Sequence, residues 1–162
     1  MSKERLDKAY SDKVTSCKKA EYGDFAGAIK TAQKIEDSCE KAYALNYIAE
    51  KQAENGDYAD AIKIAESIED YCEKWQALTE IVWKQAGNGD YVDAIKTVER
   101  IEVPVRKAHA LKFIANAQAE NGDFVDAKKT AERIEDHCCR EHSFKLIAKE
   151  RIKYKETEKI DT

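Results

Sequence analysis

The sequence predicts an all-α fold, a right-handed superhelical α-solenoid of about four 33-residue helix-pair repeats followed by a C-terminal capping helix. Two observations support this prediction. The dipeptide Gly-Asp occurs at 23–24, 56–57, 89–90 and 122–123, so that each step is 33 residues. Within this register, 20 of 33 positions are identical between 23–55 and 56–88. Self-similarity at such a period is typical of stacked repeat architectures.

Each repeat is predicted to contain two helices, because its apolar residues follow helical spacing in two separate stretches. Such a pair cannot bury its apolar face alone, so successive pairs are expected to stack. The apolar sets of the copy at 56–88 are Tyr58, Ala61, Ile62, Ala65 and Ile68, followed by Ala77, Leu78, Ile81 and Val82. Along the whole chain the pattern predicts helices at 5–22, 24–36, 38–55, 57–69, 71–88, 90–102, 104–121, 123–135 and 137–155.

The expected helix ends carry residues suited to them. Asn55-Gly56 supplies a glycine that can adopt the left-handed conformation closing a helix. Asp57 can accept hydrogen bonds from the free amides of the helix that follows. Asp70 and Glu73 have the spacing of a capping box at the next helix start. These residues therefore predict where one helix stops and the next begins.

The single proline and the last helix complete the predicted architecture. Pro104 lies at a predicted helix start, where its missing amide and fixed φ are tolerated. The last helix is expected to cap the array with a polar face that carries Arg140, Lys145, Lys149, Arg151 and Lys153. One repeat domain is expected over 1–155, and a charged, frayed tail over 156–162.

The composition limits the class of protein. The chain has 162 residues, of which 37% are charged, and its formal net charge is −4. No apolar run approaches the ~20 residues that span a bilayer, and the N-terminus lacks the apolar stretch of a secretion signal. A cytoplasmic protein without a membrane partner is therefore expected. The acidic balance also makes nucleic acid an unfavoured partner.

The five cysteines are predicted to be free thiols. An odd number without a secretion signal does not suggest a disulfide framework. Cys39, Cys72 and Cys138 share one register of the repeat, and Val105 holds it in the remaining copy. Because valine serves the same position, the expected role is that of a small, buried apolar side chain.

The sequence predicts neither an enzyme nor a cofactor. It has no P-loop, no GxGxxG and no GxSxG motif, and its carboxylates fall mostly at helix starts and solvated positions. The only local group of soft metal ligands is at 137–142, where Cys138 and His142 lie four residues apart. No paired ligand motif accompanies them, so no metal site is predicted.

Several motifs resemble the tetratricopeptide repeat. Ile48-Ala49 matches the contact carried by the first helix, called A, of that family. The segment Gly56-Asp57-Tyr58 with Ala61 matches the opening of its second helix, called B. The segments 114–115 and 122–127 repeat the match, although the period is one residue shorter than the usual ~34. The resemblance implies a tetratricopeptide-like solenoid over most of the chain.

The A helices of that family line a concave face that holds ligands, so the resemblance implies a similar face here. Positions 47, 80 and 113 are Tyr, Glu and Phe, whereas 48, 81 and 114 are all Ile. Variation among copies is expected where a face does not hold the fold together, and aromatic rings commonly anchor interfaces. The expected ligand-binding residues are Tyr43, Asn46, Tyr47, Glu50, Thr79, Trp83, His109, Lys112, Phe113 and Asn116.

The leading hypothesis is a non-catalytic scaffold that binds an unidentified protein or peptide and is a monomer or weak homodimer. Two alternatives stay open. A structural or self-assembling repeat module, natural or engineered, would also have closely similar copies. An RNA-binding helical repeat would use side chains of the same groove to read bases, although the acidic net charge opposes it.

Overall fold

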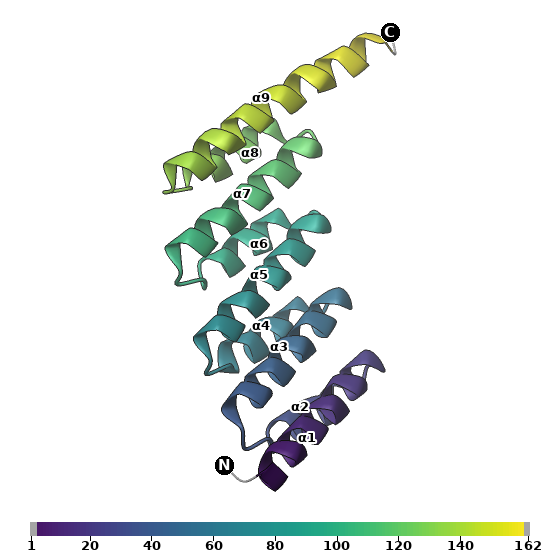
Figure 1. Ribbon diagram of the computed structural model, residues 1–162. Helices are drawn as coiled ribbons and strands as arrows, with labels where there is room; N and C mark the ends of the chain where they lie inside the picture. The colour runs from purple at the N-terminus through teal and green to yellow at the C-terminus, as the bar shows by residue number, and fades with distance from the viewer. Residues whose placement is uncertain (1–2, 161–162) are drawn as a thin grey trace. The chain divides into compact units, whose positions relative to one another are not determined.

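A computed structural model describes residues 3–160 of the chain (Figure 1). These residues form nine α-helices and no strand, which confirms the all-helical class. None of the described helices is both long and apolar enough to cross a membrane. The helices are α1 (Lys3–Glu21), α2 (Phe25–Ala32), α3 (Ser38–Glu54), α4 (Tyr58–Ser67), α5 (Tyr71–Gly87), α6 (Tyr91–Val98), α7 (Pro104–Glu120), α8 (Phe124–Glu132) and α9 (His137–Ile160).

The chain divides into two compact units, Met1–Lys84 and Gln85–Thr162, with the boundary inside α5. In the first unit α1 packs against α2 and α3, and α3 packs against α4. In the second unit α7 packs against α6, α8 and α9, and α8 also contacts α9. We call the long helices α1, α3, α5, α7 and α9 the A helices, and the short helices α2, α4, α6 and α8 the B helices. Packed helix pairs are present in each unit, while the single domain over 1–155 stays a prediction.

Alanine makes the closest helix contacts in both units. Each B helix buries one alanine of the same register completely, with 0% of its surface exposed. A side chain this small lets two helices approach closely. These residues are Ala28, Ala61, Ala94 and Ala127. Helices α3, α5 and α7 bury isoleucine at one register to the same extent, at Ile48, Ile81 and Ile114.

The Gly-Asp dipeptides close the A helices as predicted. Gly23, Gly56, Gly89 and Gly122 have φ angles of 79°, 88°, 85° and 87°. The Gly56 amide donates to the Ala53 carbonyl over 3.1 Å, and the Asp57 amide donates to the Gln52 carbonyl over 2.9 Å. The other three dipeptides make the same two bonds. Glycine is suited to this conformation because it has no Cβ to clash.

The B helices end earlier than predicted. Helix α2 ends at Ala32 rather than at 36, and α6 ends at Val98 rather than at 102. The prediction carried each helix past an apolar residue in the helical register, Ile35 and Ile101. These isoleucines are 3% and 2% exposed, but they lie in the connecting turn. A buried apolar residue just beyond the end of a helix continues the helical spacing in the sequence, so the pattern predicts one turn too many.

The predicted cap by Asp70 is confirmed at α5, and the predicted cap by Asp57 is wrong at α4. The Glu73 amide donates to Oδ1 of Asp70 over 2.9 Å at the start of α5. Pro104 is the first residue of α7, also as predicted. Asp57 precedes α4, but its side chain makes no hydrogen bond to the helix amides.

The first copy of the repeat shows why Asp57 does not cap. At the equivalent start of α2, Asp24 accepts a hydrogen bond from the Gly27 amide over 2.9 Å. A Cβ added at Gly27 would lie only 2.1 Å from Oδ2 of Asp24. The later copies carry aspartate at that position, and the first of these is Asp60. With a side chain there, an aspartate whose ψ is 55°, as at Asp57, cannot place its carboxylate where Asp24 places its own. Asp37 caps α3 across a residue that has a Cβ, but its backbone is extended, with ψ of 121°.

The cysteines are free, but three of them are not buried as predicted. Cys39, Cys72 and Cys138 are exposed free thiols, and Val105 at the same register is 61% exposed. This register falls in the first turn of an A helix, on the side that faces solvent. A small side chain is therefore tolerated there without being required by the core.

Helix α9 covers the last helix pair of the second unit. It packs against α7 and α8, and the rings of Phe124 and Tyr154 meet edge to face with centroids 5.7 Å apart. The helix continues to Ile160 instead of ending at 155. The expected fraying concerns 156–162, of which 161–162 lie outside the described residues.

Candidate binding face

The A-helix face is defined as the ten predicted ligand-binding residues on α3, α5 and α7. Six belong to the first unit and four to the second, and each unit is described by itself. Tyr43, Trp83, His109 and Phe113 are exposed; Tyr47, Glu50, Lys112 and Asn116 are half-buried; Asn46 and Thr79 are buried. Most of the predicted residues therefore reach solvent.

The ring of Tyr43 contacts Lys13 of helix α1, which also contacts the ring of Tyr10. Nζ of Lys13 lies 4.5 Å from the ring centroid of Tyr10 and 5.0 Å from that of Tyr43. The same nitrogen is 2.6 Å from Oε2 of Glu40, and this hydrogen bond raises the pKa of Lys13 above its ordinary value. A cation over two rings is a favourable arrangement. The chain's own lysine thus occupies the space between these two tyrosines.

Tyr47 links α3 to the end of α1. Its hydroxyl donates to Oε1 of Glu21 over 2.8 Å, and Nζ of Lys51 lies 5.4 Å from its ring centroid. Burial of the phenol, followed by the hydrogen bond to Glu21, raises the pKa of Tyr47 well above its ordinary value. Tyr47 is therefore a neutral hydrogen-bond donor whose ring is held in place on this face.

Asn46 and Thr79 make their hydrogen bonds within the chain. Nδ2 of Asn46 donates to Oε2 of Glu73 over 2.6 Å, which joins α3 to α5. The Thr79 hydroxyl donates to the Trp75 carbonyl one turn earlier over 2.8 Å. The two side chains are only 8% and 7% exposed. Their polar groups are used to hold the helices rather than presented to solvent.

Carboxylates give the first unit's part of the face an acidic character. Glu80 lies one turn before the exposed Trp83 on α5, so the two side chains share a helix face. Burial raises the pKa of Glu80, and the negative charge of Glu50 raises it further. A cationic group placed here would relieve this repulsion.

The second unit's part of the face is basic. His109 and Lys112 lie on α7 together with Phe113, which is 39% exposed. The Cys139 amide, and to a smaller extent His109, lower the pKa of Asp136 before α9. An anionic group would be attracted to this end of α7.

Asn116 adds an unused acceptor to the second unit's part of the face. It lies one turn after Phe113 on α7, and its Oδ1 atom is buried without a hydrogen-bond partner among the residues that the structure describes. A buried acceptor without a donor is unfavourable. Oδ1 is closed off from solvent, so it is not presented to a ligand on this face.

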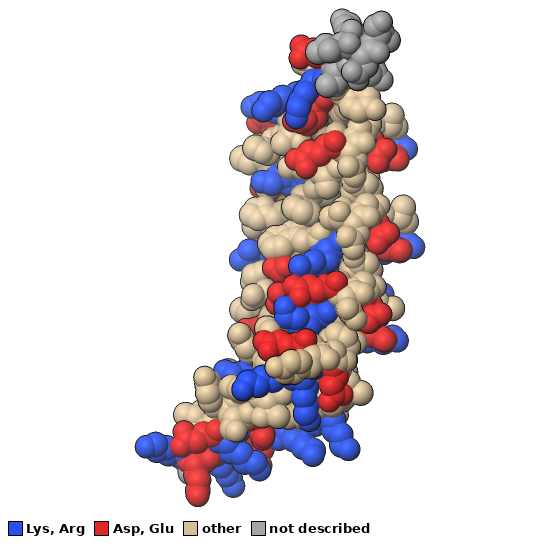
Figure 2. Space-filling model, turned by 90° about the vertical axis from the view of Figure 1, so that its right-hand side faces the viewer, with Lys and Arg blue, Asp and Glu red and all other residues tan. Residues whose placement is uncertain are grey.

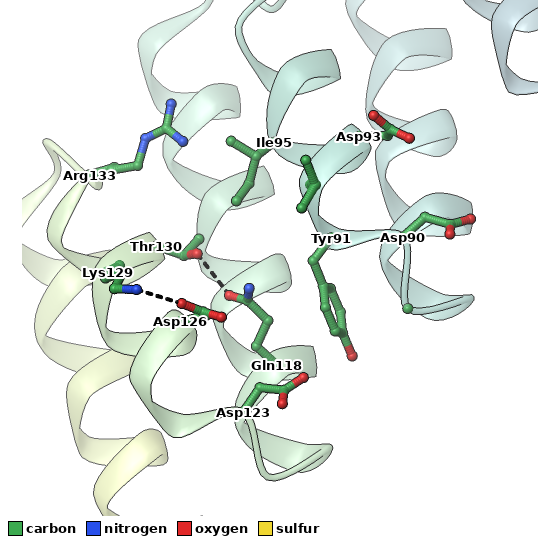
Figure 3. Close-up of a pocket in the computed structure, with 12 residues that line it drawn as sticks. Asp90, Tyr91, Asp93, Ile95, Gln118, Asp123, Asp126, Lys129, Thr130 and Arg133 are labelled. Atoms are coloured by element: carbon green, nitrogen blue, oxygen red, sulfur yellow. Dashed lines mark hydrogen bonds and ion pairs between the residues drawn. The ribbon is translucent and has the colours of Figure 1, made fainter.

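Sequence reasoning missed a hollow on the other side of α7. It lies between the B helices α6 and α8, has a volume of about 550 Å³, and is lined by Asp90, Tyr91, Ile95, Gln118, Asp123 and Thr130 among others (Figure 3). The sequence gave no sign of this hollow, because most of the residue types that line it also occur at the same positions in the other copies of the repeat. Thr130 gave no distinguishing signal either, because Thr31 and Thr97 hold the same register and Ile64 is the residue that departs from it.

The remaining charged residues give no further site. Acidic and basic side chains lie interspersed over each unit on the face shown in Figure 2. Among the side chains that the structure describes, those of residues 3–156, no group of three or more His, Cys, Asp or Glu is arranged to hold a metal ion. The group at 137–142 therefore forms no such cluster.

Comparison of the chain with protein-family models, with curated proteins and with solved structures finds no match.

Proposed function

We propose that the chain is a non-catalytic protein- or peptide-binding scaffold, a tetratricopeptide-like α-solenoid that binds through the A-helix face. The observation that carries this proposal is a contrast of exposure on the same helices. Trp83 and Phe113, at copy-variable positions, are 41% and 39% exposed, whereas the neighbouring isoleucines of α5 and α7 are 0% exposed. Large exposed aromatic rings are typical anchors of interfaces.

The charges suggest what each part of the face would bind. In the first unit Glu50 and Glu80 favour a basic segment beside Trp83, because a cation would relieve their mutual repulsion. In the second unit His109 and Lys112 favour an acidic segment beside Phe113. A peptide or a protein loop offers these groups together.

The proposal is tested by selection from a library of random peptides displayed on phage. Selected peptides are measured against the wild-type chain and the double variant Trp83→Ala/Phe113→Ala. We expect the double variant to bind more than about tenfold more weakly, because anchor residues commonly contribute 2 kcal/mol or more. The matched control is Val125→Ala, which removes an apolar side chain that is 71% exposed on the B helix α8.

The outcomes separate the proposal from its alternatives. Circular dichroism and urea unfolding of each variant establish that the fold is retained. Peptides that ignore the double variant, or that lose affinity equally with Val125→Ala, contradict binding through the A-helix face. A chain that selects no peptide but shows salt-dependent binding to single-stranded RNA would favour the nucleic-acid alternative. Concentration-dependent light scattering without any ligand would favour self-assembly.

A further inference from the structure

The side of helix α9 that faces away from α7 and α8 offers a second surface, whose role does not depend on the function proposed above. Helix α9 packs against α7 and α8, and Figure 1 shows both of these helices on one side of it. Ser143 and Ile147 are buried on the packed side. Ile152 lies about half a helical turn away from them and is 61% exposed.

The repeat shows that this exposed side has the register of a helix contact. Leu111, Ala115 and Ala119 follow one another at successive turns of α7, and all three are buried. The residues of α9 that lie 33 positions later are Phe144, Ala148 and Ile152. Ala148 and Ile152 are exposed, and Phe144 is half-buried. Helix α9 therefore keeps apolar side chains at the register that α7 buries, but leaves them open to solvent.

The three side chains of α9 form a recess rather than a ridge. Residues four apart lie one above the other on a helix, so Ala148 lies between Phe144 and Ile152. Its methyl group is much smaller than the ring on one side and the branched chain on the other. A recess of this kind accepts a side chain of a second helix, because the ridges of one helix enter the grooves of another. A flat bilayer surface has no such projection.

Helix α9 is positively charged. Over 137–156 it carries six lysines and arginines against three glutamates. Two of these glutamates are already paired within the helix. Oε1 of Glu141 is 2.7 Å from Nζ of Lys145, and Oε2 of Glu150 is 3.3 Å from Nζ of Lys153. The excess positive charge is therefore carried by other side chains.

Two of the remaining cations border the recess. Arg151 lies one turn after Ala148, and Lys155 lies one turn after Ile152. Both are exposed, and neither has an ion-pair partner among the described side chains. The third glutamate, Glu156, lies beyond them toward the end of the helix. We call Phe144, Ala148, Arg151, Ile152 and Lys155 the outer face of α9.

We infer that the outer face of α9 binds an acidic amphipathic helix of a partner protein. An apolar side chain of the partner enters the recess at Ala148 and packs between Phe144 and Ile152. Carboxylates beside it pair with Arg151 and Lys155, so charge complementarity selects the partner. A second copy of α9 would fit the recess less well, because two faces with the same excess of positive charge repel each other.

The test uses the fluorescein-labelled peptide acetyl-EALAELLAEALAELLAEA-amide, which places leucine on one side of a helix and glutamate on the other, with the full chain at low salt. Binding is followed by fluorescence anisotropy and by NMR of the Ala148 amide, so that peptide held elsewhere is not counted. We expect Arg151→Gln/Lys155→Gln to weaken binding about tenfold. Lys8→Gln/Lys18→Gln makes the same change of net charge at exposed positions of α1 and should leave the affinity within about twofold.

Ala148→Arg separates docking into the recess from attraction by charge alone. It adds a cation and fills the recess, so we expect binding at least about fivefold weaker. Because Ala148 is exposed and arginine is a good helix former, the fold should be retained, which circular dichroism checks. Tighter binding by Ala148→Arg would overturn the inference, since positive charge without a recess would then be sufficient.

The other outcomes are equally distinct. Equal losses in the two charge variants, or an unperturbed Ala148 amide signal on titration, would overturn the inference. Phosphatidylcholine–phosphatidylserine vesicles that bind the wild type but not Arg151→Gln/Lys155→Gln, while the peptide does not bind, would overturn it in favour of an anionic membrane surface. Self-association in light scattering that Ala148→Arg abolishes and the peptide does not compete with would overturn it in favour of a second copy. Trp83→Ala/Phe113→Ala should leave peptide binding unchanged, so failure here is distinct from failure of the A-helix face.

Discussion

At the residue scale, the aspartates that precede the B helices show how one neighbouring atom decides the role of a side chain. Asp24 caps α2 because Gly27 leaves room for its carboxylate. Asp57 has the same place in the repeat and similar backbone angles, but its side chain makes no cap. The residue type was readable from the sequence, whereas its role depended on the residue three positions later together with the backbone angles of the turn, which differ between Asp24 and the capping Asp37.

This difference predicts unequal effects for two otherwise equivalent substitutions. Asp24→Ala removes a capping hydrogen bond and should lower the free energy of unfolding by about 1 kcal/mol. Asp57→Ala removes only a charge near a helix N-terminus and should cost no more than about 0.5 kcal/mol. Urea unfolding followed by circular dichroism measures both. Equal losses would show that Asp57 also caps its helix in solution.

Glu80 gives a prediction about pH. Burial and the charge of Glu50 raise its pKa above the ordinary 4.5, so the folded chain binds its proton more tightly than the unfolded chain does. Glu80 therefore lowers stability at neutral pH, and the penalty disappears as the pH falls through the raised pKa toward 4.5. Glu80→Gln should be more stable than the wild type at pH 7, by less than about 1 kcal/mol, and equal to it at pH 4.

The control for that experiment is Glu36→Gln, which changes an exposed glutamate by the same chemistry. Its effect on the urea midpoint should not vary in the same way between pH 4 and 7. If Glu80→Gln were less stable than the wild type at neutral pH, the carboxylate would be stabilised in the fold rather than strained.

At the scale of the element, sequence pattern predicts the helices better than their ends. The 33-residue spacing placed all nine helices of the described chain, and the left-handed glycines are where the Gly-Asp dipeptides put them. The predicted ends of α2 and α6 each lie four residues too late, because Ile35 and Ile101 are buried whether or not the backbone is helical. The spacing of apolar residues shows which residues are buried. It does not show where the backbone hydrogen bonds of a helix end.

Two glycines near helix ends should respond to alanine in opposite directions. Gly56 has φ of +88°, so Gly56→Ala should destabilise the chain by about 1–2 kcal/mol. Gly87 ends α5 without a positive φ, and a Cβ there would meet nothing within 4 Å. Gly87→Ala should stabilise the chain by about 0.5 kcal/mol through the reduced entropy of the unfolded state. Thermal and urea unfolding give both signs, and a stabilising Gly56→Ala would contradict the left-handed turn.

At the scale of the whole molecule, the predicted site is recovered only in part, for a physical reason. Tyr43, Trp83 and Phe113 are exposed as a ligand-binding face requires. Asn46 and Thr79 are buried. Asn46 bonds Glu73 of another helix, a contact that a helical wheel does not reveal, and Thr79 bonds the Trp75 carbonyl of its own helix. The hollow between α6 and α8 was not predicted, since it arises from the joint placement of residues on three helices. The position of a residue in the repeat identifies the exposed face of a helix. Side-chain hydrogen bonds within the chain decide which residues of that face remain available to a ligand.

The central claim is that peptides bind through the A helices, and hydrogen–deuterium exchange of the chain with a selected peptide tests it most directly. The peptide is one whose affinity falls in Trp83→Ala/Phe113→Ala. We predict slower exchange in α3 and α5 or in α7, with the B helices α2, α4, α6 and α8 unchanged. Slower exchange confined to the B helices would contradict the account, because the exposed aromatic face would then play no part in binding.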